Sequence, residues 1–140
     1  MRQDRWMNAV FQIALEAPKV SEQKMAAIIV CKNSVISVGL NQMKTHPMVA
    51  TYKVKEWAEY LHAESSAVIN ALRQINFRKL EKCELYVCRS KMINGIHTWG
   101  LAKPCTTCME FLRHYPMECC YYSTDEEGNY EKIEFKEKRY

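Results

Sequence analysis

The sequence predicts a layered α/β domain in which a mixed sheet of about five strands carries helices on both faces. Segments with helical periodicity alternate along the chain with short β-rich runs, which is typical of this class. Only three residues separate the first two runs, so these should pair antiparallel, whereas the later strand–helix–strand units require parallel strands. The chain has 140 residues, 48% of them apolar, so we expect one core and a single domain over residues 1–140.

The N-terminal part is predicted to form a helix and then a β-hairpin. The helix spans residues 2–17 and ends at Pro18. Its apolar face, at helical spacing, consists of Trp6, Ala9, Val10, Ile13, Ala14 and Ala17. The hairpin joins strands at 26–31 and 35–38 through a turn at residues 32–33. Because residues 26–31 are apolar on both faces, we expect a central strand covered by helices.

The central part is predicted to be a long loop followed by a helix. Residues 41–60 show no regular period, and the helix spans residues 62–75. Its inward face carries Glu64 together with Ala67, Val68, Ala71, Leu72 and Ile75. A carboxylate on a buried face is costly unless it has a partner or a function, so Glu64 is a candidate functional residue.

The C-terminal part continues the alternation of strands and helices. We expect a strand at 84–88, a tight turn at Asn94-Gly95, a helix over 105–115, and strands at 119–123 and 130–135. In such sheets the functional site lies at the carboxyl ends of parallel strands, where loops lead into helices.

Charge and cysteine content limit the functional classes. The net charge is +4, and the basic residues are interspersed with acidic ones, which does not favour a nucleic-acid-binding protein. No apolar run reaches the ~18 residues of a membrane span, and the N-terminus does not resemble a secretory signal. We therefore expect a cytoplasmic protein without membrane contact. There the seven cysteines indicate metal binding or catalysis rather than a disulfide framework.

Two predicted helix starts carry the candidate functional residues. His62 and Glu64 open one helix, and Cys105 and Cys108, one helical turn apart, open the other. The N-terminus of a helix favours thiolate over thiol. Two thiolates and a neutral imidazole are zinc ligands, and three protein ligands leave a position for water, as in catalytic sites. The sequence therefore predicts Zn²⁺ held by His62, Cys105 and Cys108, with Glu64 as a nearby base.

Other interpretations of these cysteines are weaker. A Cys-x-x-Cys pair also occurs in thiol redox proteins, but that would leave His62 and Glu64 without a role. Half of a structural zinc site is disfavoured because no second Cys or His pair lies at zinc-finger spacing. The other cysteines lie in or beside apolar strand runs and are expected to be small core residues. They are Cys31, Cys83, Cys88, Cys119 and Cys120.

His62-Ala63-Glu64 followed by Pro104-Cys105 and Cys108 is the signature of zinc-dependent nucleobase deaminases. The chain resembles the cytidine and deoxycytidylate deaminase superfamily over almost its whole length. The resemblance implies a three-layer cytidine-deaminase-like fold, zinc on the His and the two Cys, and Glu64 as the residue that moves protons. It also implies a homo-oligomer, because family members commonly assemble.

The resemblance further indicates substrate contacts. Gly39-Leu40-Asn41 resembles the family's Gly-x-Asn, whose Asn contacts the sugar, and this role falls on Asn41. The backbone amide after the zinc-binding His holds the base, which here is Ala63. His46 is a further candidate for substrate contact, in a segment (residues 44–47) that resembles a variant found in phage deaminases.

These observations predict a hydrolytic deaminase that converts a cytosine nucleotide or nucleoside, dCMP first among them, to the uracil form and releases ammonia. One alternative is a deaminase of single-stranded DNA or RNA, acting on cytosine or adenine, which would need a basic and aromatic groove. A second alternative is a non-catalytic, zinc-stabilised binding module. Such a module would have no use for Glu64.

Overall fold

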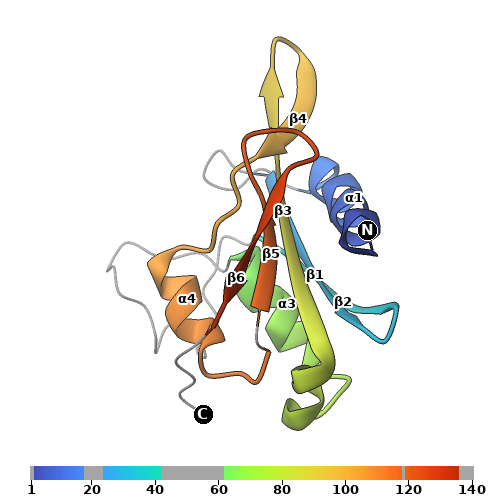
Figure 1. Cartoon of the computed structure of the whole chain (residues 1–140), viewed down its shortest axis with the longest axis vertical. Coiled ribbons are helices and arrows are strands. Elements are labelled where there is room, and N and C mark those ends of the chain that lie inside the picture. Colours follow the sequence, from blue (N-terminus) through green and yellow to red (C-terminus); the bar gives the residue numbers. More distant parts are fainter. Residues whose placement is uncertain (1, 18–23, 42–61, 118, 136–140) are drawn as a thin grey trace.

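The computed structural model describes residues 2–17, 24–41, 62–117 and 119–135. It shows three layers, with one helix on one face of a six-stranded mixed sheet and two helices on the other face (Figure 1). The strand order is β2-β1-β3-β5-β6, and β4 pairs with β3. The predicted α/β class with helices on both faces is confirmed, and the sheet has one strand more than expected.

Helix α1 (Arg2–Leu15) is the one helix among the described residues that packs on its face of the sheet. Its buried side chains include Trp6, Val10 and Ala14, as predicted, and also Met7. The predicted positions Ala9 and Ile13 are only half-buried, so the buried face is rotated toward Met7. The helix also ends two residues earlier than the predicted end at residue 17.

Strands β1 (Lys24–Cys31) and β2 (Ser34–Leu40) form the predicted antiparallel hairpin. Lys32 and Asn33 both have positive φ, 48° and 66°, which is the conformation of a two-residue hairpin turn with the twist of the sheet. Strand β1 lies between β2 and β3 and is buried along most of its length, so the predicted central strand is confirmed.

Helix α3 (Ala63–Ala71) packs on β1 and β2, on the face opposite α1. It is shorter than the predicted helix over 62–75, since residues 72–75 form turns. It is also buried on nearly all sides rather than along one stripe, and even Ser65 and Ser66 are inaccessible. A short 3₁₀ helix, η1 (Phe77–Lys82), then leads into the sheet.

Strand β3 (Cys83–Ile93) is twice as long as the predicted strand at 84–88. Its outer half turns at Asn94 and Gly95, both with positive φ, and returns as β4 (Ile96–Gly100). This hairpin extends beyond the body of the molecule (Figure 1), and its tip is exposed. Strand β4 was not predicted, because only its last two residues are buried and it therefore shows no clear hydrophobic periodicity.

Helix α4 (Thr106–Leu112) lies on the same face as α3 and is shorter than the predicted 105–115. Strand β5 (Cys119–Ser123) has the predicted bounds and runs parallel to β3. Strand β6 (Tyr130–Glu134) pairs antiparallel with β5 at the sheet edge. Strands β2 and β3, which precede and follow α3 along the chain, also run parallel to each other, but β1 lies between them in the sheet.

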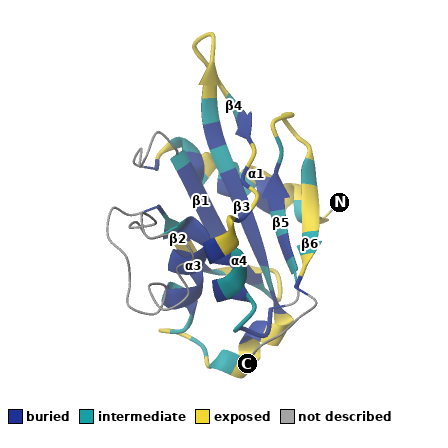
Figure 2. Ribbon diagram, turned by 90° about the vertical axis from the view of Figure 1, so that its left-hand side faces the viewer, coloured by how far each residue is buried: buried dark blue, intermediate teal, exposed yellow. Residues whose placement is uncertain are grey.

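Within the described ranges, no helix is long and apolar enough to cross a membrane. The predicted loop at 41–60 lies outside the described residues, except for Asn41. Figure 2 shows that the buried residues gather in the middle of the sheet and on the faces of the helices that pack on it.

The contact between β2 and α3 depends on a glycine. A Cβ atom at Gly39 would lie 2.2 Å from the carbonyl oxygen of Ala63 and 2.3 Å from the backbone nitrogen of Ala67. Beside it, Ser37 Oγ donates a hydrogen bond of 2.8 Å to the carbonyl oxygen of Ala67. The backbones therefore approach more closely than any side chain at position 39 would permit.

We expect Gly39→Ala to lower the free energy of unfolding by about 3 kcal/mol or more, because its methyl group meets rigid backbone. Gly100→Ala is the matched control, since its nearest neighbour is the flexible Arg89 side chain at 3.0 Å. The control should change stability by about 1 kcal/mol or less. Urea unfolding of both variants measures the difference, and equal losses would contradict the close contact.

Candidate metal and proton-transfer site

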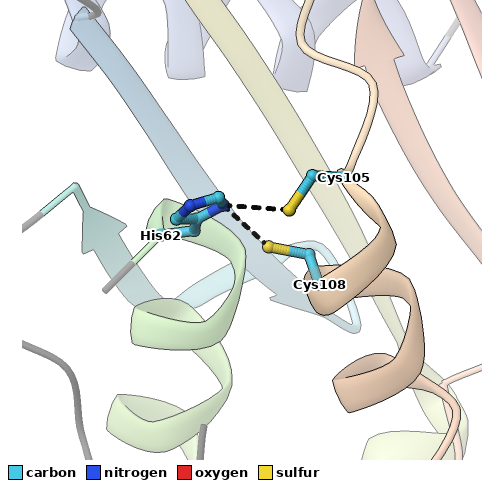
Figure 3. Close-up of side chains that lie close together, drawn as sticks. All are labelled: His62, Cys105 and Cys108. Carbon is cyan, nitrogen blue, oxygen red and sulfur yellow. Dashed lines mark hydrogen bonds between the residues drawn. The ribbon is translucent and has the colours of Figure 1, made fainter. Parts of the chain in front are cut away.

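The N-termini of α3 and α4 lie next to each other, and the N-cap residue of each helix is a candidate ligand. His62 is the N-cap of α3 and Cys105 the N-cap of α4, both with extended backbone. Their carbonyl oxygens accept the first helical hydrogen bonds, from Ser66 (3.0 Å) and Met109 (2.9 Å). Each side chain is turned toward the other helix rather than toward its own first turn (Figure 3).

The sulfur atoms of Cys105 and Cys108 both lie close to one ring nitrogen of His62. His62 Nδ1 lies 3.4 Å from Cys105 Sγ and 3.0 Å from Cys108 Sγ (Figure 3). Cys108 reaches the same point as Cys105 because it follows one helical turn later. The three atoms lie within 4.8 Å of one another and form the one such group of potential ligands found in the described part of the chain.

Glu64 lies at the inner side of this group. Its side chain is 1% exposed, and its Oε1 has no hydrogen-bond partner among the residues that the structure describes. Burial raises the pKa of the Glu64 carboxyl, and the charge of His62 only partly offsets this effect. A buried acceptor without a partner is expensive to keep in a folded protein, which marks Glu64 as a functional group.

The two thiols differ in their environment. Cys105 is exposed, and its hydrogen bonds from Cys108 and His62 lower its pKa to about 4. Cys108 is 1% exposed, and its interaction with Cys105, together with burial, holds its pKa well above the usual value. A thiolate at Cys105 is therefore already stabilised, whereas Cys108 needs a further positive charge beside it to ionise.

Asn41 and Ala63 contact each other directly. The Ala63 N–H, at the first residue of α3, donates a hydrogen bond of 2.8 Å to Asn41 Oδ1, and both residues are buried. The side chain after β2 thus caps the helix whose start holds His62 and Glu64. His46, the remaining candidate for substrate contact, lies outside the described residues.

Sequence reasoning missed the residues that position Cys105. Ser123, the last residue of β5, donates from its Oγ to the Gly100 carbonyl (2.6 Å) and accepts from the Arg89 N–H (3.2 Å). Its own carbonyl accepts from the Ala102 N–H (2.9 Å). The Leu101 N–H donates to Asp125. These bonds hold the segment leading to α4, and nothing in the local sequence pattern indicates them.

The donor set fits zinc. One imidazole nitrogen and two thiols are preferred zinc ligands, and in a tetrahedral site of this kind the ligand atoms lie about 3.5 Å apart. The observed separations of 3.0 and 3.4 Å are close to this value. A cation here would also provide the positive charge that the buried Cys108 thiol and the Glu64 carboxyl lack.

Comparisons with known proteins agree with this geometry. The profile of the family described as "Cytidine and deoxycytidylate deaminase zinc-binding region" matches residues 1–124. The fold is similar to that of a dCMP deaminase from the cyanophage S-TIM5 in apo form, with 17% identity, a TM-score of 0.58, and coverage of 89% of this chain and 84% of that chain. It is also similar to the S-TIM5 dCMP deaminase in complex with dCMP and dUMP, with 16% identity, a TM-score of 0.57, and coverage of 89% of this chain and 82% of that chain. No curated protein sequence matches the chain significantly.

We expect purified protein to contain one zinc ion per chain, and Cys108→Ser to lose it, because a weaker donor replaces one of three protein ligands. Cys88→Ser is the matched control, since Cys88 is also buried but packs on the α1 face of the sheet. Elemental analysis after dialysis measures the ratio. Metal-free wild-type protein, or a native Cys105–Cys108 disulfide, would contradict the assignment.

Proposed function

The chain belongs to the cytidine and deoxycytidylate deaminase family, and on this basis we propose that it is a zinc-dependent hydrolytic deaminase of a cytosine nucleotide or nucleoside. Its product is the uracil form of the same compound, with ammonia released. The observation that carries the proposal is the buried Glu64 carboxylate, without a partner at Oε1, beside three converging zinc-type ligands. A purely structural metal site would have no use for this group.

The ligand and acid–base residues have separate roles. Zinc held by His62, Cys105 and Cys108 would supply a Lewis acid that makes water nucleophilic near neutral pH. Glu64 accepts a proton from the attacking water at a carboxylate oxygen and delivers it to the ring nitrogen of the base. Glu64 then takes the remaining proton from the hydroxyl group on the attacked carbon and passes it to the amine, so that the carbonyl forms, the C–N bond breaks and ammonia leaves. The enclosed position of Glu64 keeps competing water away from its oxygens.

We propose dCMP as the first substrate to test. The S-TIM5 enzyme, which shares the fold, is described in complex with dCMP and dUMP. Asn41 and the Ala63 backbone are our candidates for contacts with sugar and base. Because the Ala63 N–H is donated to Asn41 Oδ1 in the structure, a base held by this amide would replace that hydrogen bond. His46 remains a third candidate.

We expect purified, zinc-loaded protein to release ammonia from dCMP with a higher kcat/KM than from cytidine or from single-stranded cytosine oligonucleotides. An ammonia assay over this panel measures the preference. Faster deamination of the oligonucleotide would contradict a small-molecule substrate. Absence of turnover on every member, with zinc bound, would favour a binding module instead.

The Glu64→Gln variant is the matched control for this assay. It keeps the shape of the side chain but cannot accept a proton, so turnover should fall by ~10²–10⁴-fold or more while zinc content is retained. Activity within about tenfold of wild type would correspond to only ~1.4 kcal/mol of barrier. That result would mean that another residue moves the proton.

Two substitutions at Asn41 separate capping from substrate binding. Asn41→Asp keeps an oxygen for the Ala63 N–H but removes the amide donor, whereas Asn41→Ala removes both. A lost substrate hydrogen bond costs roughly 1–3 kcal/mol, so both variants should lose about 5- to 150-fold in kcat/KM and keep zinc. Only Asn41→Ala should also lower the melting temperature. Full activity of Asn41→Asp would restrict Asn41 to capping.

A further inference from the structure

We propose that Cys31 and Cys83 form a second reactive thiol site, a cross-strand pair that a hydroperoxide oxidises to a disulfide. The pair lies outside the His62–Cys105–Cys108 group and plays no part in the proposed deamination. Both cysteines are free thiols in the structure.

The sheet register places the two residues directly opposite each other. Cys31 is the last residue of β1 and Cys83 the first residue of β3, and they are antiparallel partners. Directly opposite residues in such a pair have Cα atoms about 4.5–5.5 Å apart, within the ~4.4–6.8 Å that a disulfide spans. Both side chains lie on the sheet face that packs against α3 and α4. The register is therefore compatible with the Cα separation that a disulfide requires.

The side chains already interact. Burial and then the neighbouring Cys31 thiol raise the pKa of Cys83, whose Sγ lies 3.4 Å from the Lys79 carbonyl oxygen, to which it donates a hydrogen bond. Cys83 is 4% exposed, whereas Cys31, next to the hairpin turn, is half-buried. Cys31 is thus the more accessible thiol and the one that an oxidant meets first.

An open cavity of about 290 Å³ adjoins Cys83, and its lining includes Val30 and Lys32, the two chain neighbours of Cys31. Its charged lining residues are Arg2, Lys32, Glu81, Lys82 and Glu84. Cys119 lines the same cavity and is the competing partner that an experiment must distinguish. Cys88 and Cys120 are fully buried and should not react.

The chemistry proceeds in two balanced steps. The Cys31 thiolate attacks one oxygen of the hydroperoxide, the O–O bond breaks, and the sulfur becomes a sulfenic acid while the hydroperoxide is reduced to an alcohol or water. The Cys83 sulfur then attacks the Cys31 sulfur, the S–O bond breaks, and the departing oxygen leaves as water with the Cys83 proton. Burial and the neighbouring Cys31 raise the pKa of Cys83 to about 12, so Cys83 is the weaker nucleophile toward the hydroperoxide and reacts second.

The bond would close a loop over residues 32–82, which contains His62 and Glu64. A cross-link of this span restricts the unfolded chain and raises the melting temperature by on the order of 10 °C. Oxidation at this pair would therefore stabilise the half of the molecule that carries the proton-transfer residue.

The test uses zinc-loaded protein, in which Cys105 and Cys108 are occupied, treated with a small excess of hydrogen peroxide. We expect intact mass to fall by two hydrogen atoms and non-reducing peptide mapping to find the Cys31–Cys83 link. The melting temperature should rise, and dithiothreitol should reverse both changes. These readouts do not involve deamination, so they are independent of the proposed function.

Cys31→Ser and Cys83→Ala should each abolish the link and the stabilisation, and Cys119→Ser is the matched control that should keep both. The wild-type peptide map decides the question even where a variant fails to fold. A link from Cys83 to Cys119, over-oxidation of Cys31 without a link, or oxidation confined to Cys105 and Cys108 would each overturn the proposal.

Discussion

The close contact between the end of β2 and the first turn of α3 is the constraint on which the site depends. Gly39 leaves room for the backbone of Ala63, and within two residues of it Ser37 and Asn41 each hydrogen-bond to α3. These contacts fix both the distance of the helix from the sheet and the position of its first residue. Because His62 and Glu64 flank that residue, these contacts fix the backbone positions from which the imidazole and the carboxyl group extend.

Several buried polar groups lie together at the site, and their charges offset one another only in part. Glu64 and Cys108 are almost inaccessible. Burial raises the pKa of the Glu64 carboxyl, and the interaction with Cys105 together with burial raises the pKa of the Cys108 thiol. His62 is charged more readily than usual: burial lowers its pKa, but Cys105 and Glu64 outweigh this and the pKa is raised. One imidazole cannot neutralise two sulfurs and a carboxylate, so the pocket is suited to a cation.

Sequence patterns predicted the structural features that depend on residues close together in the chain. The spacing of Cys105 and Cys108, the hairpin turn at residues 32–33 and the strand at 119–123 are all local features. The predicted helices extend beyond the observed ends. The reason is that apolar residues such as Leu72 and Ile75, which lie in the turn after α3, still pack on the core. The roles of Gly39 and Ser123 depend on partners far along the chain, which no single-sequence period reveals.

The hydrogen bonds of Ser123 also affect the order in which a nascent chain can assemble the site. The part around His62 and Glu64 is held by contacts among residues 37–67, all of which leave the ribosome early. The segment leading to Cys105 is held by Ser123 and Asp125, which are synthesised after it. The half of the site around Cys105 therefore becomes fixed later during synthesis than the half around His62.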